Sequence, residues 1–192
     1  VPVRRILAET GVKNVFVVPE QEKPDGDFPT VQSPNPENSE AFDIAIGYAA
    51  QQNADLIFGT DPDGDRIGVV VKTADGRYEV LNGNQTGCIL LEYILRKQKG
   101  NGTLPQNGAV VKTIVTSDLV RRIADNYGVR TLDVLTGFKF IGEKIKEFEQ
   151  SGEHSFVFGL EESFGYLKGT YARDKDAVVA AMLICEAAAD LK

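Results

Sequence analysis

Continuous apolar runs and stretches with helical spacing alternate along this chain of 192 residues. Continuous runs bounded by turn residues are typical of buried strands, and they occur at residues 12–18, 54–59, 67–72, 108–117 and 129–135. A short strand and turn are expected at 77–85, and a strand followed by a loop at 154–165. Apolar residues at helical spacing predict helices at 3–11, 39–52, 86–98, 117–128, 136–152 (after a short loop) and 174–191.

This alternation of strands and helices predicts an α/β fold with two consecutive domains, each a layered sheet with flanking helices. A break near Gly76 to Tyr78 divides the chain into residues 1–78 and 79–192, and both lengths are usual for a domain. A helix as the first element is unusual, because an α/β unit normally enters its helix from a strand. We therefore expect the chain to begin inside a domain, without that domain's opening strand.

Polar and glycine residues indicate where several elements begin and end. Ser39 and Ser117 are predicted N-caps, because a serine side chain can accept a hydrogen bond from a free backbone N–H at the start of a helix. Gly11 and Gly128 are predicted to end helices. Residues 19–38 are rich in Pro, Asp and Gly, so we expect a long loop, which in a compact domain is usually functional or disordered.

The composition argues against several classes of protein. A hydrophobic fraction of 42% supports a real core. A net charge of -7 without any run of Lys or Arg argues against nucleic-acid binding. The sequence has no apolar stretch of the roughly 18 residues that a membrane span needs, and no signal-peptide pattern, so neither membrane insertion nor export is predicted.

The expected location is therefore cytoplasmic, and the cysteine pattern agrees with a reducing compartment. Cys88 and Cys185 lie far apart in apolar runs, without the spacing of a zinc site or a redox pair, and we expect two buried free thiols. His154 is the only histidine, and we expect it to be exposed in a loop.

The stretch GTDPDGDRIGVVV places three carboxylates at alternate positions, Asp61, Asp63 and Asp65, between two apolar runs. Like charges this close repel one another unless a positive group lies among them. Alternate positions of an extended segment point the same way, so the three side chains can converge on one cation. Hard carboxylate oxygens suit Mg²⁺ or Ca²⁺.

Three other interpretations of the aspartate run were compared with the sequence. An EF-hand calcium loop needs Gly at its sixth position and Glu at its twelfth, where this chain has Arg66 and Lys72, and it needs flanking helices. An aspartyl-phosphate hydrolase typically has Thr or Val four residues after its nucleophile, where this chain has Asp65. A solvent-exposed acidic turn remains open, because Asp and Gly are ordinary turn residues.

The segment from Asp61 to Arg66, DPDGDR, resembles the metal-binding loop of the α-D-phosphohexomutases, the phosphoglucomutase and phosphomannomutase family. The resemblance implies that Asp61, Asp63 and Asp65 bind Mg²⁺ together with a phosphoserine oxygen. It also implies that Arg66 lies beside the phosphate and has a catalytic role.

A second segment, Thr136 to Gly142 (TGFKFIG), resembles a sugar-recognition loop in the third domain of the same family. The resemblance implies that Gly137, Phe138 and Lys139 contribute to substrate binding. Taken alone, the segment would be better explained as a glycine-containing turn before an amphipathic helix.

A third segment, Gly159 to Gly165 (GLEESFG), is similar to the family's sugar-binding loop, which implies that Glu161 and Ser163 bind sugar hydroxyls. A carboxylate acceptor and a hydroxyl two residues apart suit a vicinal diol. As an isolated pattern it could also be a capping box.

The fourth segment, RDKD from residue 173 to 176, resembles the family's R-x-K-D segment. The resemblance implies that Arg173 is near the substrate and Lys175 near the reacting centre. Lys175 could act as an acid or base only if burial or neighbouring cations lowered its pKa. A solvated charged helix start is the alternative. Residues 25–38 also resemble the family's second domain, but no catalytic role is assigned to them.

The resemblance covers nearly the whole chain and corresponds to the second and third of the family's four domains. It implies binding of hexose phosphate and hexose 1,6-bisphosphate, and interconversion of glucose 1-phosphate and glucose 6-phosphate through a phosphoserine and a bisphosphate intermediate. The first domain, with its serine, and the fourth domain are expected to be missing, so the chain alone is expected to be inactive.

The segment TGFKF favours glucose over the alternatives within the family, a phosphomannomutase or a phosphoglucosamine mutase. A non-catalytic relative that binds sugar phosphates is a further alternative from a different functional class.

Overall fold

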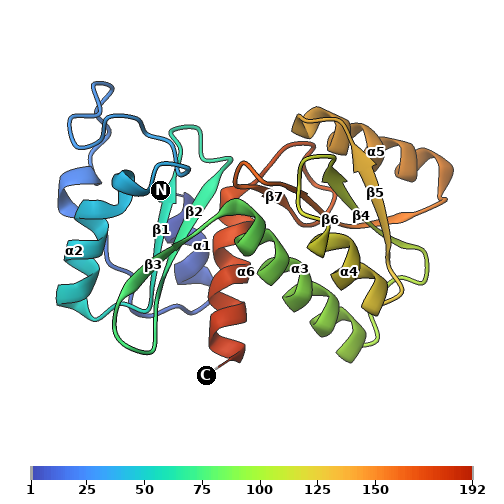
Figure 1. Ribbon diagram of the computed structural model, residues 1–192, viewed down its shortest axis with the longest axis horizontal. Helices are drawn as coiled ribbons and strands as arrows, with labels where there is room; N and C mark the ends of the chain where they lie inside the picture. The colour runs from blue at the N-terminus through green and yellow to red at the C-terminus, as the bar shows by residue number, and fades with distance from the viewer. Residues whose placement is uncertain (1, 192) are drawn as a thin grey trace.

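The computed structural model describes residues 2–191 and contains two β-sheets with helices packed on them (Figure 1). The helices are α1 (Pro2–Glu9), α2 (Asp43–Gln52), α3 (Gly83–Gly100), α4 (Leu119–Asn126), α5 (Phe138–Ser151) and α6 (Ala177–Asp190), with short 3-10 helices η1 (Pro19–Gln21) and η2 (Ser39–Phe42). The strands are β1 (Leu56–Thr60), β2 (Ile67–Lys72), β3 (Tyr78–Leu81), β4 (Gly108–Thr113), β5 (Arg130–Val134), β6 (Ser155–Glu161) and β7 (Gly165–Leu167). The predicted α/β class is confirmed.

The first sheet is an antiparallel meander in the order β1-β2-β3. Alternate residues of a strand point to opposite faces. Val70 of β2 therefore packs with Phe42 and Ala45 on the side of α2, whereas Ile67 and Val69 belong to the core shared with α6. Both faces of this sheet are covered, so its central strand is an almost continuous apolar run.

The second sheet has the order β5-β4-β6-β7, in which β4 is parallel to both neighbours and β7 is antiparallel to β6. Helix α5 covers one face, where Ile141 and Ile145 pack with Val111 of β4. On the other face α3, α4 and α6 contribute to the core that contains Val110 and Val120. Helices on both faces of a mainly parallel sheet form an α/β/α layer arrangement.

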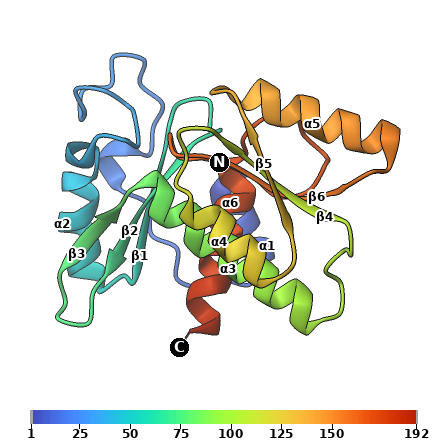
Figure 2. The ribbon, with the colours of Figure 1, turned by 45° about the vertical axis from the view of Figure 1, so that its right-hand side comes forward.

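Helix α6 lies between the two sheets in both views (Figures 1 and 2). It contacts α1, β1 and β2 on one side and α3 and β7 on the other. The sheets are also joined by the backbone, because the N–H of Ile67 donates to the carbonyl of Phe164 (3.1 Å) and Arg66 forms an isolated bridge with Gly165. The turn between β1 and β2 is therefore held against the turn between β6 and β7.

Two sequence-based predictions near the N-terminus are wrong. Residues 12–18 form no strand: no strand of the described chain pairs with them, and the side chains of Val15 and Phe16 are exposed. Ser39 does not cap an α-helix, because residues 39–42 form η2 and α2 begins only at Asp43.

Smaller differences concern the second half of the chain. Helix α3 begins at Gly83 instead of Thr86, because Asn82 and Gln85 form a reciprocal capping box ahead of it. Asp118, not Ser117, occupies the N-cap position of α4. Strand β7 was not expected.

The single histidine is also placed differently from the prediction. His154 is half-buried and lies edge-on against the Phe148 ring, with 5.3 Å between ring centroids. Both cysteines are free as predicted, Cys88 buried and Cys185 half-buried. No helix within residues 2–191 is both long and apolar enough to cross a membrane.

Candidate functional site

The three aspartates lie on the turn that connects β1 to β2. The turn is closed by its own backbone, since the N–H of Gly64 donates to the carbonyl of Asp61 (3.1 Å). Gly64 has a φ of 73°, a conformation that glycine adopts without steric penalty. The Asp61 carboxylate accepts hydrogen bonds from the backbone N–H groups of Asp65 (3.2 Å) and Arg66 (3.1 Å). Backbone N–H groups of the turn itself therefore orient the carboxylate of Asp61.

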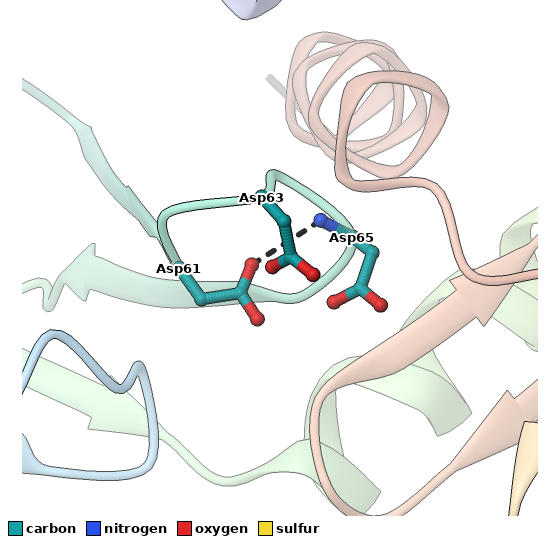
Figure 3. Close-up of side chains that lie close together, drawn as sticks. All are labelled: Asp61, Asp63 and Asp65. Carbon is teal, nitrogen blue, oxygen red and sulfur yellow. Dashed lines mark hydrogen bonds between the residues drawn. The ribbon is translucent and has the colours of Figure 1, made fainter.

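The carboxylates of Asp61, Asp63 and Asp65 converge (Figure 3). One oxygen from each lies within 4.8 Å of the others. Asp61 is buried, Asp65 half-buried and Asp63 exposed, so the cluster opens to solvent on one side. Three carboxylate oxygens at this spacing are a donor set that a hard divalent cation such as Mg²⁺ or Ca²⁺ could bind.

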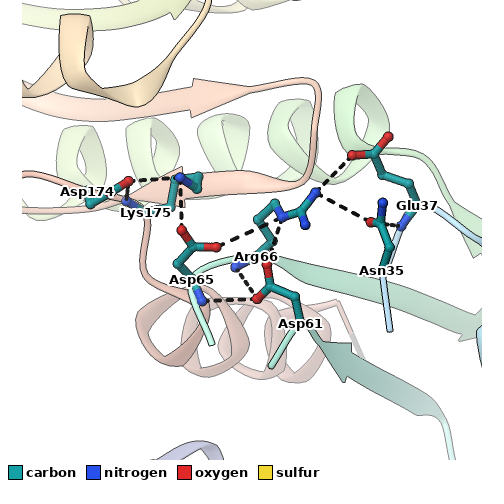
Figure 4. A network of polar contacts seen from close by, with 7 residues as sticks. All are labelled: Asn35, Glu37, Asp61, Asp65, Arg66, Asp174 and Lys175. Carbon is teal, nitrogen blue, oxygen red and sulfur yellow. Dashed lines mark hydrogen bonds and ion pairs between the residues drawn. The ribbon is translucent and has the colours of Figure 1, made fainter. Parts of the chain in front are cut away.

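Two cationic side chains flank this cluster (Figure 4). Arg66 Nε donates to Oδ2 of Asp61 (2.7 Å), and Nζ of Lys175 lies 2.9 Å from Oδ2 of Asp65. Burial raises the pKa of Asp61, but the hydrogen bonds from Arg66 outweigh it and the pKa is lowered overall. Burial and the neighbouring Asp61 keep the pKa of Asp65 above its ordinary value in spite of Lys175. Three carboxylates therefore lie beside two cationic side chains.

Arg66 also reaches a second loop. Its Nη1 donates to Oε1 of Glu37 (3.0 Å) and to Oδ1 of Asn35 (3.4 Å), both in the long loop before η2. Neither residue had a predicted role. A pattern of residue types could not reveal the contact, because it joins segments distant in sequence.

Lys175 lies in the segment that leads into α6, and its side chain is only 15% exposed. Its stem crosses Gly165, where an added Cβ would lie 2.2 Å from Cδ of the lysine. Burial lowers the pKa of Lys175, but hydrogen bonds and charges from Asp174 and Asp65 outweigh it and raise the pKa. These contacts favour the positively charged form of Lys175.

Glu161 joins the two segments that resemble sugar-binding loops, residues 136–142 and 159–165. This buried residue ends β6, and its Oε1 accepts a hydrogen bond from the backbone N–H of Gly137 (2.8 Å). Burial raises the pKa of its carboxyl group. Phe138 follows on the same segment, and its ring centroid lies 5.5 Å from Nζ of Lys175. Ser163 is half-buried and makes no side-chain hydrogen bond within residues 2–191.

Glu162, which the sequence analysis did not select, fixes the turn that carries Glu161 and Ser163. Its Oε2 accepts hydrogen bonds from the hydroxyls of Thr113 and Thr116, both 2.9 Å long. The two contacts join residues 49 and 46 positions apart, so the local sequence did not indicate them.

Lys139 and Arg173 line the same groove. This open groove of about 520 Å³ lies beside α5 and is also lined by Phe140, Gly142, Glu143 and Lys146. Arg173 forms an ion pair with Glu149 at 2.5 Å. Among residues 2–191, neither Lys139 nor Arg173 makes a hydrogen bond or ion pair with the turn from Asp61 to Arg66. The structure therefore brings Asp61, Asp63, Asp65, Arg66 and Lys175 into one cluster, and Lys139 and Arg173 make no polar contact with the aspartate turn.

Comparison with known proteins identifies both halves of the chain. Residues 1–76 match the family model for phosphoglucomutase/phosphomannomutase alpha/beta/alpha domain II, and residues 82–192 match the model for domain III. Residues 77–81, which lie between the two matches, contain β3.

Curated relatives include phosphoglucomutases from two staphylococci. The protein of Staphylococcus epidermidis is 41% identical over 187 residues, and that of Staphylococcus aureus is 37% identical over 190 residues. The matches cover 97% and 99% of this chain but only 33% of each relative. The chain thus spans about a third of the length of the relatives it matches.

Solved structures support the fold. A phosphoglucomutase/phosphomannomutase family protein from Burkholderia thailandensis matches 83% of this chain and 31% of its own, with a TM-score of 0.62 and 21% identity. Parafusin, a phosphoglucomutase from Paramecium in an open form, matches 83% of this chain and 26% of its own, with a TM-score of 0.56 and 21% identity. The two family models match most of the sequence, and they establish that this chain belongs to the phosphoglucomutase/phosphomannomutase family, the α-D-phosphohexomutases.

Proposed function

We propose that this chain forms the metal-binding and sugar-recognition parts of a phosphoglucomutase-type enzyme that interconverts glucose 1-phosphate and glucose 6-phosphate. The observation that supports it most is the convergence of Asp61, Asp63 and Asp65 beside two cations, Arg66 and Lys175. A phosphoryl group in transfer needs this combination of a carboxylate-bound metal and neighbouring positive charge.

In this proposal Asp61, Asp63 and Asp65 hold Mg²⁺, which supplies electrostatic stabilisation to the transferring phosphoryl group. Arg66 adds hydrogen bonds to the phosphoryl oxygens. Lys175 acts as a fixed positive charge beside the same group, in keeping with its raised pKa. Both cations therefore stabilise charge that develops in the transition state.

The sugar is proposed to bind at the turn between β6 and β7. Glu161 accepts a hydrogen bond from a sugar hydroxyl with the carboxylate oriented by the N–H of Gly137. Ser163 donates or accepts a second one. Phe138, Lys139 and Arg173 contribute further contacts, the last two from the groove beside α5.

The phosphoryl donor is proposed to be a phosphoserine that lies outside the matched third of the relatives' length. The phosphoserine transfers its phosphoryl group to the hexose phosphate, which gives a hexose 1,6-bisphosphate. This intermediate reorients in the site and returns its other phosphoryl group to the serine. On this basis residues 1–192 alone have no mutase activity. A coupled assay with glucose 1-phosphate and a bisphosphate activator tests this, and turnover above background would contradict it.

Ligand binding tests the proposed site without requiring turnover. The chain is titrated calorimetrically with glucose 1,6-bisphosphate, with and without Mg²⁺. We expect binding that depends on Mg²⁺ and that weakens in Glu161→Gln, with Glu153→Gln as the matched exposed control. Binding that is unchanged by both Mg²⁺ and Glu161→Gln would contradict the proposed site.

The choice of hexose is a separate question. The segment TGFKF favours glucose, while a phosphomannomutase or phosphoglucosamine mutase would use the same metal site. Rates measured on the longer enzyme with glucose, mannose and glucosamine phosphates distinguish these substrates. Absence of turnover with all three would instead support a non-catalytic relative that binds sugar phosphates.

A further inference from the structure

The segment from Asn35 to Glu37 packs on strand β2 through its central residue, Pro36. Pro36 is buried, and a Cβ added at Gly68 would lie 3.0 Å from Cβ of Pro36 and 3.1 Å from its carbonyl oxygen. Such distances are too short for a side chain at Gly68 without movement of the proline. The glycine therefore permits the loop to lie directly on the strand.

The packing of Pro36 on β2 places its two neighbours, Asn35 and Glu37, within reach of Arg66. Residues two apart on an extended strand point to the same face, so Arg66 and Gly68 share the face on which the loop lies. Asn35 and Glu37 flank the proline and both contact Nη1 of Arg66 (Figure 4). Oδ1 of Asn35 also accepts the backbone N–H of Glu37 (3.0 Å), which closes the loop on itself.

The contacts of the Arg66 guanidinium are distributed unevenly over its nitrogens. Nε is bound to Asp61 and Nη1 to Asn35 and Glu37, whereas Nη2 has no hydrogen bond or ion pair within the described part of the chain. A planar group held at two of its three nitrogens has its orientation defined, and its third nitrogen remains available as a donor.

We infer that Asn35 and Glu37 are positioning residues, which fix the guanidinium plane of Arg66 and keep Nη2 free for an anionic oxygen. The inference rests on the proposed function only for the nature of that anion, a phosphoryl group. Glu37 is 44% exposed, and an ion pair so exposed contributes little to folding stability. Orientation of Arg66 is therefore the effect expected from this contact, and variants of Glu37 are expected to fold.

The direct test is side-chain NMR of the ¹⁵N-labelled chain. Rotation about the Nε–Cζ bond exchanges Nη1 with Nη2, and the signal of Arg66 is assigned by its loss in Arg66→Lys. In the double variant Asn35→Ala with Glu37→Ala, we expect the Arg66 guanidinium to rotate about its Nε–Cζ bond about tenfold faster, since a charge-assisted hydrogen bond is lost. Glu37→Gln, which retains an acceptor oxygen, should give an intermediate rate.

Glu40→Ala is the matched control, because Glu40 is an exposed acid in η2, three residues along, and its side chain has no hydrogen bond or ion pair within residues 2–191. The rotation rate of the Arg66 guanidinium in this control should equal that in the unmodified chain. Equal rates in the double variant and in the control would overturn the inference.

A titration with inorganic phosphate in the presence of Mg²⁺ separates this inference from the proposed function. We expect phosphate binding to weaken severalfold in the double variant and not in Glu40→Ala. If phosphate does not bind even the unmodified chain while the rotation rates still differ, the positioning role stands and the proposed phosphoryl site fails. If phosphate binds through Arg66 with unchanged rotation, the positioning role fails instead.

Discussion

The ammonium group of Lys175 lies 2.9 Å from Oδ2 of Asp65, and so it joins the segment before α6 to the aspartate turn of the first sheet. The stem of the lysine is confined over Gly165, so the ammonium group has little freedom to move away. A cation bound by the three aspartates would therefore experience a fixed positive charge nearby. The contact makes Lys175 a competitor of the metal as well as a partner of the proposed phosphoryl group.

Substitution of Lys175 by Met is expected to tighten Mg²⁺ binding. Methionine keeps an unbranched stem over Gly165 and removes the charge that repels the cation. Relief of about 1 kcal/mol of repulsion at this separation corresponds to about fivefold higher affinity. Calorimetric titration with Mg²⁺ measures the change, and Lys72→Met, whose lysine contacts Asn53 instead, is the control. Weaker binding in Lys175→Met would show that the lysine helps to assemble the metal site.

Two glycines of helix α3 are expected to respond in opposite ways to substitution by alanine. A Cβ at Gly83 would lie 1.8 Å from the carbonyl oxygen of Glu162, so the turn with Glu161 and Ser163 would have to move. We expect Gly83→Ala to lower the free energy of unfolding by about 3 kcal/mol, as overpacking does. Urea denaturation measures this loss.

Gly100 provides the comparison at the other end of the same helix. A Cβ there meets nothing within 4 Å among residues 2–191. We expect Gly100→Ala to raise the free energy of unfolding by about 0.5 kcal/mol, because alanine favours the helix. Similar effects at Gly83 and Gly100 would contradict the close packing between α3 and the turn after β6.

The buried carboxyl group of Glu161 is expected to make stability depend on pH. Its pKa is raised by burial in the folded chain, so the folded state binds a proton more tightly than the unfolded state. This contribution to stability is fully present below the unfolded pKa and is lost as pH rises through the folded pKa. Glu161→Gln removes the titration and keeps an acceptor for the N–H of Gly137.

The measurement compares the free energy of unfolding of the unmodified chain and of Glu161→Gln at several pH values from acidic to neutral. We expect the variant to gain stability relative to the unmodified chain as pH rises. A difference that does not vary with pH would mean that Glu161 titrates at its ordinary value.

Local patterns predicted the elements whose residues interact mainly with near neighbours. The apolar runs of β2 and β4 follow from strands buried on both faces, and the turn from Asp61 to Arg66 is formed by residues adjacent in sequence. The apolar run at 12–18 led to a wrong strand prediction, because a run of this kind forms a strand only where another strand pairs with it.

Contacts between distant segments could not be predicted in the same way. Nothing in the residue pattern shows that Glu37 reaches Arg66, that Lys175 reaches Asp65, or that Thr116 reaches Glu162. Each contact joins segments distant in sequence, and the contact between Lys175 and Asp65 also depends on how α6 packs between the two sheets. The family resemblance indicated which segments matter, whereas their mutual orientation required the folded chain.

The most direct test of the metal site is calorimetric titration of Mg²⁺ into the unmodified chain, Asp63→Asn and Asp75→Asn. Asp63 is exposed and makes no hydrogen bond or ion pair within residues 2–191, so its loss should leave stability within about 0.5 kcal/mol. Asp75 is an exposed acid of another turn in the same sheet, paired with Arg77. We predict that Mg²⁺ affinity falls on the order of tenfold in Asp63→Asn, which loses one of three carboxylate ligands, and is unchanged in Asp75→Asn. Equal Mg²⁺ affinity in all three proteins would contradict the account.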